Sequence, residues 1–441
     1  MSKGLKKDKC RCYFFIRLIL FMSFFCIEYP VYANILDEVI KDSSYADLED
    51  RFDTLLFRPD FGIDPNVAII SNETIDNLEK SIAFYKRIVD KGGWPQLSES
   101  WVLRLGSSGS SVQKLRERLI ISGDLDPTKR LSSIFDSYVE SAVKHFQVRH
   151  GLYPDGVLTV STIQAMNVSA DLRIQQLHVN LVRIRGLLEK KMGSRYVVVN
   201  IPAADVNAID NGKVVLRSIA IVGRIDRQTP LLHSQIRQII LNPHWVIPRS
   251  IIKKDVMELM RVDPLYLDDN NIRLINEHGV QVRPEDVDWN APEAPNLIFR
   301  QDPGKINAMA STKIEFYSKN NVYMHDTPEP TLFSNVMRFE TSGCIRISNI
   351  ISLSTWLLKD TPGWSRHRIE EIVKTRKTTF VNLAQEVPVH FIYVSAWSAK
   401  GPEDLVVHFR DDVYGWDHLN VEAASVPLPN IIPAEPTLSQ Q

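Results

Sequence analysis

The sequence predicts a multi-domain α+β protein, with helices in its first half and a β-rich domain in its second half. Up to about residue 193, apolar side chains recur at the spacing of amphipathic helices. From residue 195 onward, β-branched runs alternate with turn signals such as Asn211-Gly212, which are typical of strands and hairpins. At 441 residues the chain is also longer than one compact domain usually is.

Composition is that of an ordinary globular protein and excludes one class of function. Hydrophobic residues make up 44% of the sequence and charged residues 24%, which are typical values. The formal net charge is −1. Because there is no basic excess, the sequence does not indicate a nucleic-acid partner.

The first 33 residues differ from the rest and predict an export signal. Basic residues precede an apolar, aromatic run from Tyr13 to Ile27, and Val31-Tyr32-Ala33 is typical of a signal-peptidase site. The run has about 15 residues, whereas a membrane-spanning helix needs roughly 20. We therefore expect residues 1–33 to be a cleaved signal peptide and the mature protein to be periplasmic. The alternative is an uncleaved anchor in the inner membrane that faces the periplasm.

Removal of this segment would leave a single cysteine. Three of the four cysteines lie within residues 1–33, so the mature chain would keep only Cys344. One thiol cannot form an internal disulfide, and a lone cysteine in an exported protein is a candidate reactive thiol. The alternative is an inert, buried cysteine that serves as a small hydrophobic side chain.

The helical half divides into three parts. Residues 34–100 predict a helical scaffold, because apolar positions recur at helical spacing. Residues 101–168 predict three short amphipathic helices, the third preceded by the turn Pro154-Asp155-Gly156. Residues 169–194 predict a helical connector to the β-rich domain.

Residues 195–418 predict the β-rich domain. Strand signals occur at Arg195–Pro202, Lys213–Val222, Ile236–Leu241, Thr312–Tyr317, Tyr323–Met324, Val389–Ala396 and Asp404–Phe409. Between them, the segment at about 249–298 is charged, helix-leaning and interrupted by prolines, which predicts a helical capping insertion. Residues 419–441 are rich in proline and polar residues and predict a disordered tail.

Two short motifs in the β-rich domain suggest acyl-transfer chemistry. His325 ends a predicted strand, and Cys344 follows a glycine. A thiol needs help to ionise at neutral pH, and a nearby histidine can be its base. Gly343 lets a substrate carbonyl approach the backbone closely, so the local N–H groups could form an oxyanion hole. We therefore predict Cys344 as nucleophile and His325 as general base and acid.

These motifs resemble the catalytic core of L,D-transpeptidases (YkuD-type domain), in particular the large periplasmic, YcbB-like branch. Cys344 follows His325 by 19 residues, and its motif reads Thr341-Ser342-Gly343-Cys344-Ile345-Arg346. Further matches are Thr229-Pro230, Asn242–Pro248, Gln301–Gly304 and Asp411–Gly415. Two positions differ from the family pattern: Thr341 replaces the usual serine, and Ser342 stands where many members have a histidine.

Residues 101–168 resemble the three-helix peptidoglycan-binding module of many wall enzymes. The matching residues are the Gly106–Gly109 turn, the pair Phe146-Gln147 and the Pro154-Asp155-Gly156 turn before Thr159. This resemblance implies peptidoglycan as partner. The alternative is a helical bundle that serves only as a spacer.

Together, the resemblances imply an enzyme that forms 3–3 cross-links in peptidoglycan. Cys344 would attack the diaminopimelate carbonyl of a tetrapeptide donor stem and release the terminal D-alanine. The side-chain amine of an acceptor stem would then resolve the acyl-enzyme. No metal or organic cofactor is implied, and other wall-synthesis proteins are candidate partners.

Four further residues are candidates for the site. Arg346 could hold a substrate carboxylate or pair with a structural acid. Tyr323 could line the pocket or belong to the core, and Trp245 could face the donor stem or only pack. Ser342 could contribute to the oxyanion hole. The remaining histidines show no metal-ligand spacing, so the sequence does not support a zinc hydrolase.

Two other functions stay open. A cysteine peptidase that hydrolyses stem peptides, or a protein–peptidoglycan linkage, would use the same two residues with water as the acceptor. A non-catalytic wall-binding protein would combine the three-helix module with a decayed enzyme domain. The intact set of His325, Gly343, Cys344 and Arg346 argues against decay.

Overall fold

The computed structural model describes residues 67–190, 192–292, 295–401 and 405–417. The predicted signal peptide, the first half of the predicted scaffold and the predicted C-terminal tail lie outside these residues. None of the helices within the described ranges has the length and hydropathy needed to span a bilayer.

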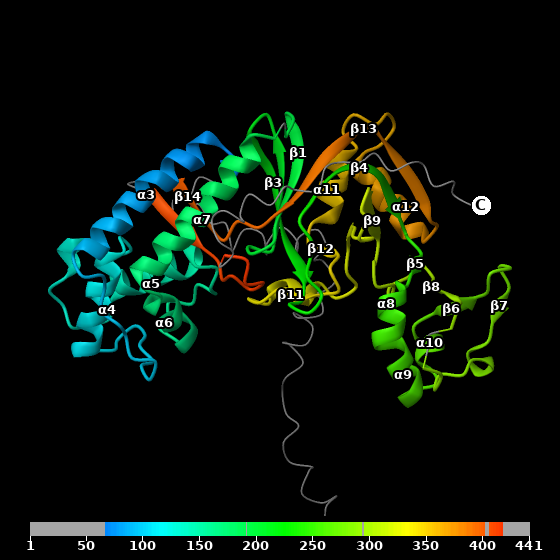
Figure 1. Ribbon diagram of the computed structural model, residues 1–441, viewed down its shortest axis with the longest axis horizontal. Coiled ribbons are helices and arrows are strands. Elements are labelled where there is room, and N and C mark those ends of the chain that lie inside the picture. Colours follow the sequence, from blue (N-terminus) through cyan, green and yellow to red (C-terminus); the bar gives the residue numbers. More distant parts are fainter. Residues whose placement is uncertain (1–66, 191, 293–294, 402–404, 418–441) are drawn as a thin grey trace, which may run out of the picture. The chain divides into compact units, whose positions relative to one another are not determined.

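A mixed sheet forms the centre of the β-rich domain. The described strands of this sheet follow the order β11-β3-β12-β10-β9-β4-β13-β1-β2, and Figure 1 shows them in the middle of the domain. They are β1 (Arg195–Asn200), β2 (Asp205–Asp210), β3 (Lys213–Gly223), β4 (Leu232–Leu241), β9 (Thr312–Phe316), β10 (Met324–His325), β11 (Phe339–Thr341), β12 (Ile345–Ile347) and β13 (Thr379–Ile392). Because β2 also pairs with β3, the sheet closes on itself, and β11 is added beside β3.

The position of β1 between two cores explains why its sequence is apolar at almost every position. Val197 and Val199 point into the core inside the closed sheet, together with helices α11 (Ile350–Leu357) and α12 (Arg366–Thr375). Tyr196 and Val198 point to the opposite side, into a second core. Successive side chains of a strand alternate between faces, so a strand between two cores has no polar face.

The second core joins the scaffold helix to the connector. Helix α3 (Asn72–Asp90) packs against α7 (Ala170–Leu188) and against a hairpin of β14 (Ala396–Lys400) and β15 (Leu405–Phe409). The sequence predicted these last strands within the β-rich domain, residues 195–418, without assigning them to a sheet. In the structure β13 ends at Ile392, and β14 and β15 pair only with each other among the described strands. Val394, Val407 and Phe409 pack on the helices instead. Strand signals are local and do not reveal which core a hairpin joins.

The three-helix prediction for residues 101–168 is confirmed. Helices α4 (Ser110–Ile121), α5 (Ser137–Arg149) and α6 (Val160–Asn167) share one core, with a short 3-10 turn η2 (Pro127–Lys129) between the first two. The Gln147 amide oxygen accepts a hydrogen bond from Gly156 N–H at 2.9 Å, and the Gln147 amide nitrogen donates to Asp155 at 2.8 Å. The Phe146-Gln147 and Pro-Asp-Gly motifs therefore hold each other in place.

The capping insertion has its own core, and it contains strands as well as the predicted helices. Its helical part comprises α8 (Arg249–Ile251), a π-helical turn η3 (Ile252–Val256), α9 (Met257–Val262), α10 (Tyr266–Asp269) and the 3-10 turn η4 (Pro284–Asp286). Its described strands are β5 (Trp245–Val246), β8 (Ile298–Gln301), β6 (Ile272–Ile275) and β7 (Gln281–Val282), paired in that order. Strands of two to four residues are too short to show a clear period in the sequence.

Candidate active site

The pairing of β10 with β12 brings the two predicted catalytic residues onto neighbouring strands. The strands are parallel, with Met324 opposite Ile345 and His325 opposite Arg346. The Ile345 N–H donates to the Tyr323 carbonyl at 3.1 Å, which places Cys344 beside Tyr323. Because side chains alternate along each strand, this register directs Tyr323, His325, Cys344 and Arg346 to one face of the sheet.

The imidazole of His325 is oriented by a hydrogen bond to the backbone of the next residue, Asp326. Its Nδ1 donates to the Asp326 carbonyl oxygen at 2.6 Å, so the hydrogen-bonding pattern assigns the proton to Nδ1 and leaves the lone pair on Nε2. Burial and the charge of Arg346 lower the pKa of His325 to about 3, against the raising effect of the Asp326 carbonyl. The imidazole is therefore neutral at physiological pH, which is the form a general base requires.

The Cys344 thiol is also neutral at rest. Burial raises the pKa of the thiol above its ordinary value, while hydrogen bonds from Tyr323 and the charges of Lys313 and Arg346 oppose that rise. Within the described ranges, no hydrogen bond or ion pair joins Cys344 to His325. The aromatic ring of Tyr323 lies next to both residues, with its centroid 5.5 Å from that of His325.

Trp245 reaches this cluster from the insertion. Its indole Nε1 donates to the Tyr323 hydroxyl at 3.2 Å, and its ring packs at the edge of the insertion core. Burial is the main cause of a raised pKa of Tyr323, so the phenol stays protonated and can donate a hydrogen bond. Trp245 thus packs in the insertion, one of its two predicted roles, and also contacts Tyr323 of the candidate site.

In the loop before Cys344, a backbone N–H that was predicted to contribute to an oxyanion hole is bonded within the loop itself. The Gly343 N–H donates to Thr341 Oγ1 at 3.1 Å, and Thr341 Oγ1 donates to the Cys344 carbonyl at 2.6 Å. Ser342 Oγ accepts a hydrogen bond from Arg227 at 2.8 Å. In this conformation the Gly343 N–H is therefore not free for a substrate oxygen, whereas the Ser342 hydroxyl keeps its own proton to donate. Gly343 has a φ of 112°, a conformation that favours glycine.

Two motifs that resemble the family pattern, Thr229-Pro230 and Asp411–Gly415, support this loop, although no role was predicted for them from the sequence. Thr229 Oγ1 donates to the Gly343 carbonyl at 3.0 Å and accepts from the Gly223 N–H at 2.9 Å. The Tyr414 hydroxyl donates to the Gly223 carbonyl at 2.5 Å and accepts from the Thr229 N–H at 3.2 Å. The motifs Thr229-Pro230 and Asp411–Gly415 thus position the loop that presents Cys344.

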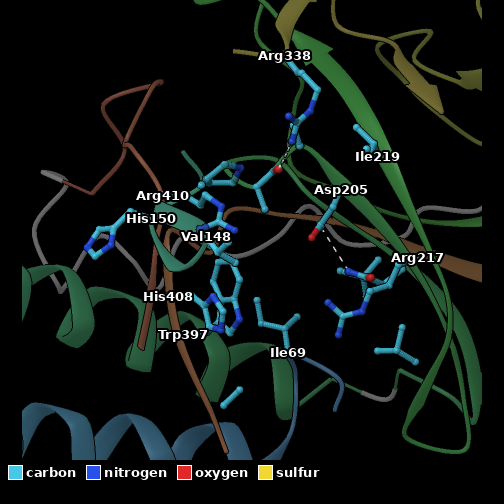
Figure 2. A pocket seen from close by; sticks show the side chains of 18 of the residues that line it. Ile69, Val148, His150, Asp205, Arg217, Ile219, Arg338, Trp397, His408 and Arg410 are labelled. Carbon is cyan, nitrogen blue, oxygen red and sulfur yellow. Dashed lines mark hydrogen bonds between the residues drawn. The ribbon is translucent and has the colours of Figure 1, made fainter. Parts of the chain in front are cut away.

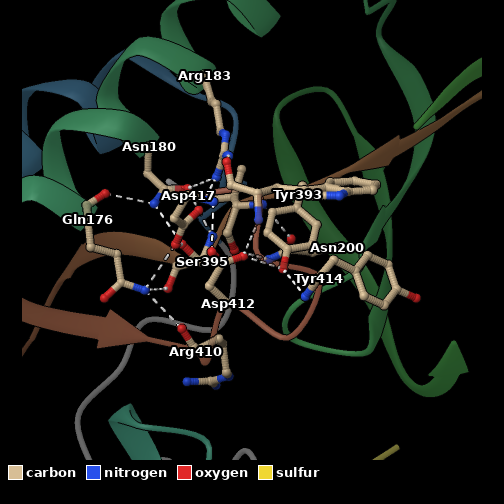
Figure 3. Close-up of polar contacts among 12 residues, drawn as sticks. Gln176, Asn180, Arg183, Asn200, Tyr393, Ser395, Arg410, Asp412, Tyr414 and Asp417 are labelled. Atoms are coloured by element: carbon tan, nitrogen blue, oxygen red, sulfur yellow. Dashed lines mark hydrogen bonds and ion pairs between the residues drawn. The ribbon is translucent and has the colours of Figure 1, made fainter. Parts of the chain in front are cut away.

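Tyr414 belongs to a buried polar network that runs from helix α7 (Figure 3). The Tyr414 N–H donates to the Tyr393 hydroxyl at 3.0 Å, and that hydroxyl donates to Asp412 at 2.7 Å. Asp412 accepts the Asp417 N–H at 2.8 Å, and Asp417 pairs with Arg183 of α7 at 2.5 Å. The connector helix and the support of the catalytic loop therefore share one hydrogen-bonded chain.

Arg346 has no acid partner in the described part of the chain. Its Nε is buried without a hydrogen-bond partner there, and burial lowers the pKa of Arg346 although the charges of Glu329 and Glu340 oppose this. The structural ion pair, one of its two predicted roles, is thus not formed. A half-buried guanidinium without a carboxylate partner is suited to bind one from a ligand.

One cavity of about 170 Å³ lies away from the thiol (Figure 2). Arg217, Arg338 and Arg410 surround the buried carboxyl of Asp205, and Trp397 forms part of its wall. Burial raises the pKa of Asp205, while these three arginines oppose the rise. Tyr323, His325 and Cys344 are not among its lining residues. In the described ranges, no group of three or more His, Cys, Asp or Glu residues could hold a metal ion.

Comparison with known proteins matches two parts of the chain to families. Residues 194–369 match the L,D-transpeptidase catalytic domain (YkuD), and residues 108–166 match a putative peptidoglycan-binding domain. The chain is 31% identical over 243 residues to a putative L,D-transpeptidase of Haemophilus influenzae, a match that covers 55% of this chain and 48% of that protein. The chain therefore spans about half the length of this curated relative.

Solved structures with similarity to the chain include two L,D-transpeptidases. The protein from Xylanimonas cellulosilytica is 14% identical, with 68% of this chain and 98% of that chain covered and a TM-score of 0.22. The protein from Stackebrandtia nassauensis is 11% identical, with 68% and 96% covered and a TM-score of 0.24.

The fold and the family matches define an α+β protein that joins a β-rich catalytic domain to a peptidoglycan-binding domain. Its β-rich domain is similar to the L,D-transpeptidase catalytic domain over residues 194–369.

Proposed function

We propose that this protein is a cysteine-dependent L,D-transpeptidase that forms 3–3 cross-links in peptidoglycan. One observation carries the proposal: in an L,D-transpeptidase domain, the β10–β12 register gathers Cys344, His325, Tyr323 and Arg346 on one face. Donor and acceptor stem peptides are the proposed substrates, and peptidoglycan is the proposed partner of the helical module.

The first step is acylation of the thiol by the donor stem. Cys344 Sγ forms a bond to the diaminopimelate carbonyl carbon, and the amide bond to the terminal D-alanine breaks. The thiol proton passes to His325 Nε2 and then to the leaving amine, so D-alanine departs as a free amino acid. Because both groups are neutral at rest, the proton moves only when a substrate carbonyl is in place.

The second step transfers the acyl group to the acceptor stem. The side-chain amine of the acceptor attacks the thioester carbon, the C–S bond breaks, and the amine proton returns to the thiol by way of His325. The covalent intermediate gives ping-pong kinetics. Tyr323 would donate a hydrogen bond to the thiolate, and Arg346 would bind a free carboxylate of a stem.

Hydrolysis is the alternative outcome of the same chemistry. In a cysteine peptidase, water would resolve the acyl-enzyme and only shortened stems would appear. A wall-binding protein without activity would form neither product. We place the reaction in the periplasm, because the first 33 residues carry the features of an export signal.

Purified protein incubated with disaccharide-tetrapeptide muropeptides distinguishes these functions. We expect cross-linked dimers and free D-alanine by mass spectrometry, and a Cys344→Ala variant should form neither. Cys344→Ser is the matched control for size. Products limited to tripeptides would indicate a peptidase, and dimer formation by the Cys344→Ala protein would refute the assignment of the nucleophile.

A further inference from the structure

Arg227 connects the insertion to the loop that precedes Cys344. Its guanidinium donates to both carboxylate oxygens of Asp255, at 2.7 and 2.8 Å, and also to Ser342 Oγ at 2.8 Å. Asp255 lies in the π-helical turn of the insertion, whereas Ser342 lies two residues before the thiol. A single side chain therefore touches both parts.

The geometry of this contact is stronger than that of an ordinary surface ion pair. The Arg227 side chain is only 13% exposed, and its fork engages the carboxylate with two parallel bonds. Such bidentate pairs fix direction as well as distance. The hydrogen bonds to Asp255 raise the pKa of Arg227 by more than burial lowers it, so the guanidinium stays charged.

Both ends of the connection are firmly held. Asp255 is flanked in its turn by Ile252 and Val256, which are buried in the insertion core. At the other end, the backbone oxygens of Arg227 and Gln228 lie 3.8 and 3.5 Å from the position that a Cβ on Gly343 would occupy. A displacement of the Arg227 backbone would thus change its contacts with Gly343 in the catalytic loop.

Electrostatic activation of the thiol does not explain this contact. The positive charges that act on the Cys344 pKa are those of Lys313 and Arg346. The contact of Arg227 with the motif is instead a hydrogen bond to Ser342, which orients that residue. The role suggested by the contacts is mechanical.

We propose that Arg227 is a positioning residue that couples the insertion, residues 245–301, to the catalytic loop, residues 341–344. When Asp255 holds Arg227, Ser342 is fixed and the loop presents Cys344 to the substrate. Movement of the insertion would release the loop. The inference rests on the proposed function for its effect on turnover, but the coupling itself can be measured without turnover.

Hydrogen–deuterium exchange of the full chain tests the coupling directly. Asp255→Asn weakens the fork and should speed exchange in peptides that cover residues 341–346, on the other side of the contact. The matched control is Asp286→Asn, since Asp286 forms a similar fork with Arg283 inside the insertion, at 2.9 and 3.1 Å, away from the loop. That control should leave residues 341–346 unchanged. If Asp255→Asn also leaves them unchanged in a folded protein, the coupling is refuted.

Kinetics then test the positioning role. Arg227→Lys keeps the charge but loses the fork, and we expect the turnover number to fall on the order of tenfold with the KM for the donor stem nearly constant. The double variant Arg227→Lys/Asp255→Asn should be no slower than Arg227→Lys alone, because Asp255 acts through Arg227. Additive losses would overturn the proposal. If the wild-type protein shows no transpeptidase activity, the proposed function fails while the exchange experiment still decides the coupling.

Discussion

The indole of Trp245 donates a hydrogen bond to the hydroxyl of Tyr323 at 3.2 Å. Because the phenol oxygen accepts this bond, its own proton can point toward Cys344. Burial raises the pKa of Cys344, and hydrogen bonds from Tyr323 oppose that rise. An aromatic residue of the insertion thus orients a donor at the thiol. This relationship and the contact of Arg227 with Ser342 place two residues outside the His325–Cys344 pair beside the proposed nucleophile.

Replacing Tyr323 by Phe should make the thiol less acidic. The variant loses a hydrogen bond to the thiolate, and hydrogen bonds to charged groups are worth about 1.5–3 kcal/mol. We expect the pKa of Cys344 to rise by about one unit or more and alkylation by iodoacetamide at pH 7 to slow about tenfold or more. Tyr317→Phe is the control, because that tyrosine directly follows β9, is 42% exposed and is not among the groups that shift the Cys344 pKa. Equal alkylation profiles of Tyr323→Phe and wild type would contradict the role.

The pH dependence of stability should report the buried His325. Its folded pKa of about 3 lies below the ordinary 6.5, so between these values the unfolded state binds more protons than the folded state. The contribution of His325 to stability is therefore fully present above about pH 6.5 and is lost as the pH falls toward 3. We expect His325→Gln to flatten the fall of the melting temperature between pH 6.5 and pH 4. An unchanged slope would mean that the imidazole already titrates normally in the folded protein.

Replacing Tyr414 by Phe should weaken the support of the catalytic loop. The buried Thr229 N–H and Gly223 carbonyl would lose their partner, which costs about 1–3 kcal/mol of unfolding free energy. Because Thr229 also holds the Gly343 carbonyl, turnover should fall as well, with the KM nearly constant. Urea denaturation and steady-state kinetics check the two effects. A variant that loses stability but keeps full turnover would show that the network only stabilises the fold.

Arg346 should be required for substrate binding but not for folding. Arg346→Gln removes a buried charge that has no acid partner in the described ranges, so the melting temperature should stay constant or rise. The KM for the donor stem should increase about tenfold or more, as expected for loss of a charge-assisted bond. Arg346→Lys keeps the charge, so its KM for the donor stem should lie between those of Arg346→Gln and the wild type. A drop in stability with an unchanged KM would instead assign Arg346 a structural role.

Local features of this protein could be predicted from its sequence. The helices of residues 101–168 form because apolar residues recur at helical spacing, and α4, α5 and α6 share the core that this spacing implies. The β-branched run after Arg195 forms β1 for a similar reason. His325 and Cys344 could be singled out because they lie in short motifs that resemble a known catalytic domain.

The conformation of the loop before Cys344 and the contacts between distant segments could not be predicted. The sequence indicated that the Gly343 N–H could contribute to an oxyanion hole, but in the structure this N–H donates to Thr341, since the loop satisfies its own donors when it turns. Strand signals also indicated the final strands but not that β14 and β15 pack on α3 and α7. The first outcome depends on how the loop turns, and the second on which distant surface the hairpin packs against.

By itself, the sequence determined the helical and strand periodicity, the single thiol that follows the predicted signal and the identity of the domain that carries it. Only the tertiary structure decided that Tyr323 and Arg346 share a face with that thiol, and that Arg227 touches both Asp255 and Ser342. The physical reason is that periodicity arises from neighbours along the backbone. Strand register and side-chain contacts, in contrast, depend on which distant surfaces pack together to bury apolar area and satisfy hydrogen bonds.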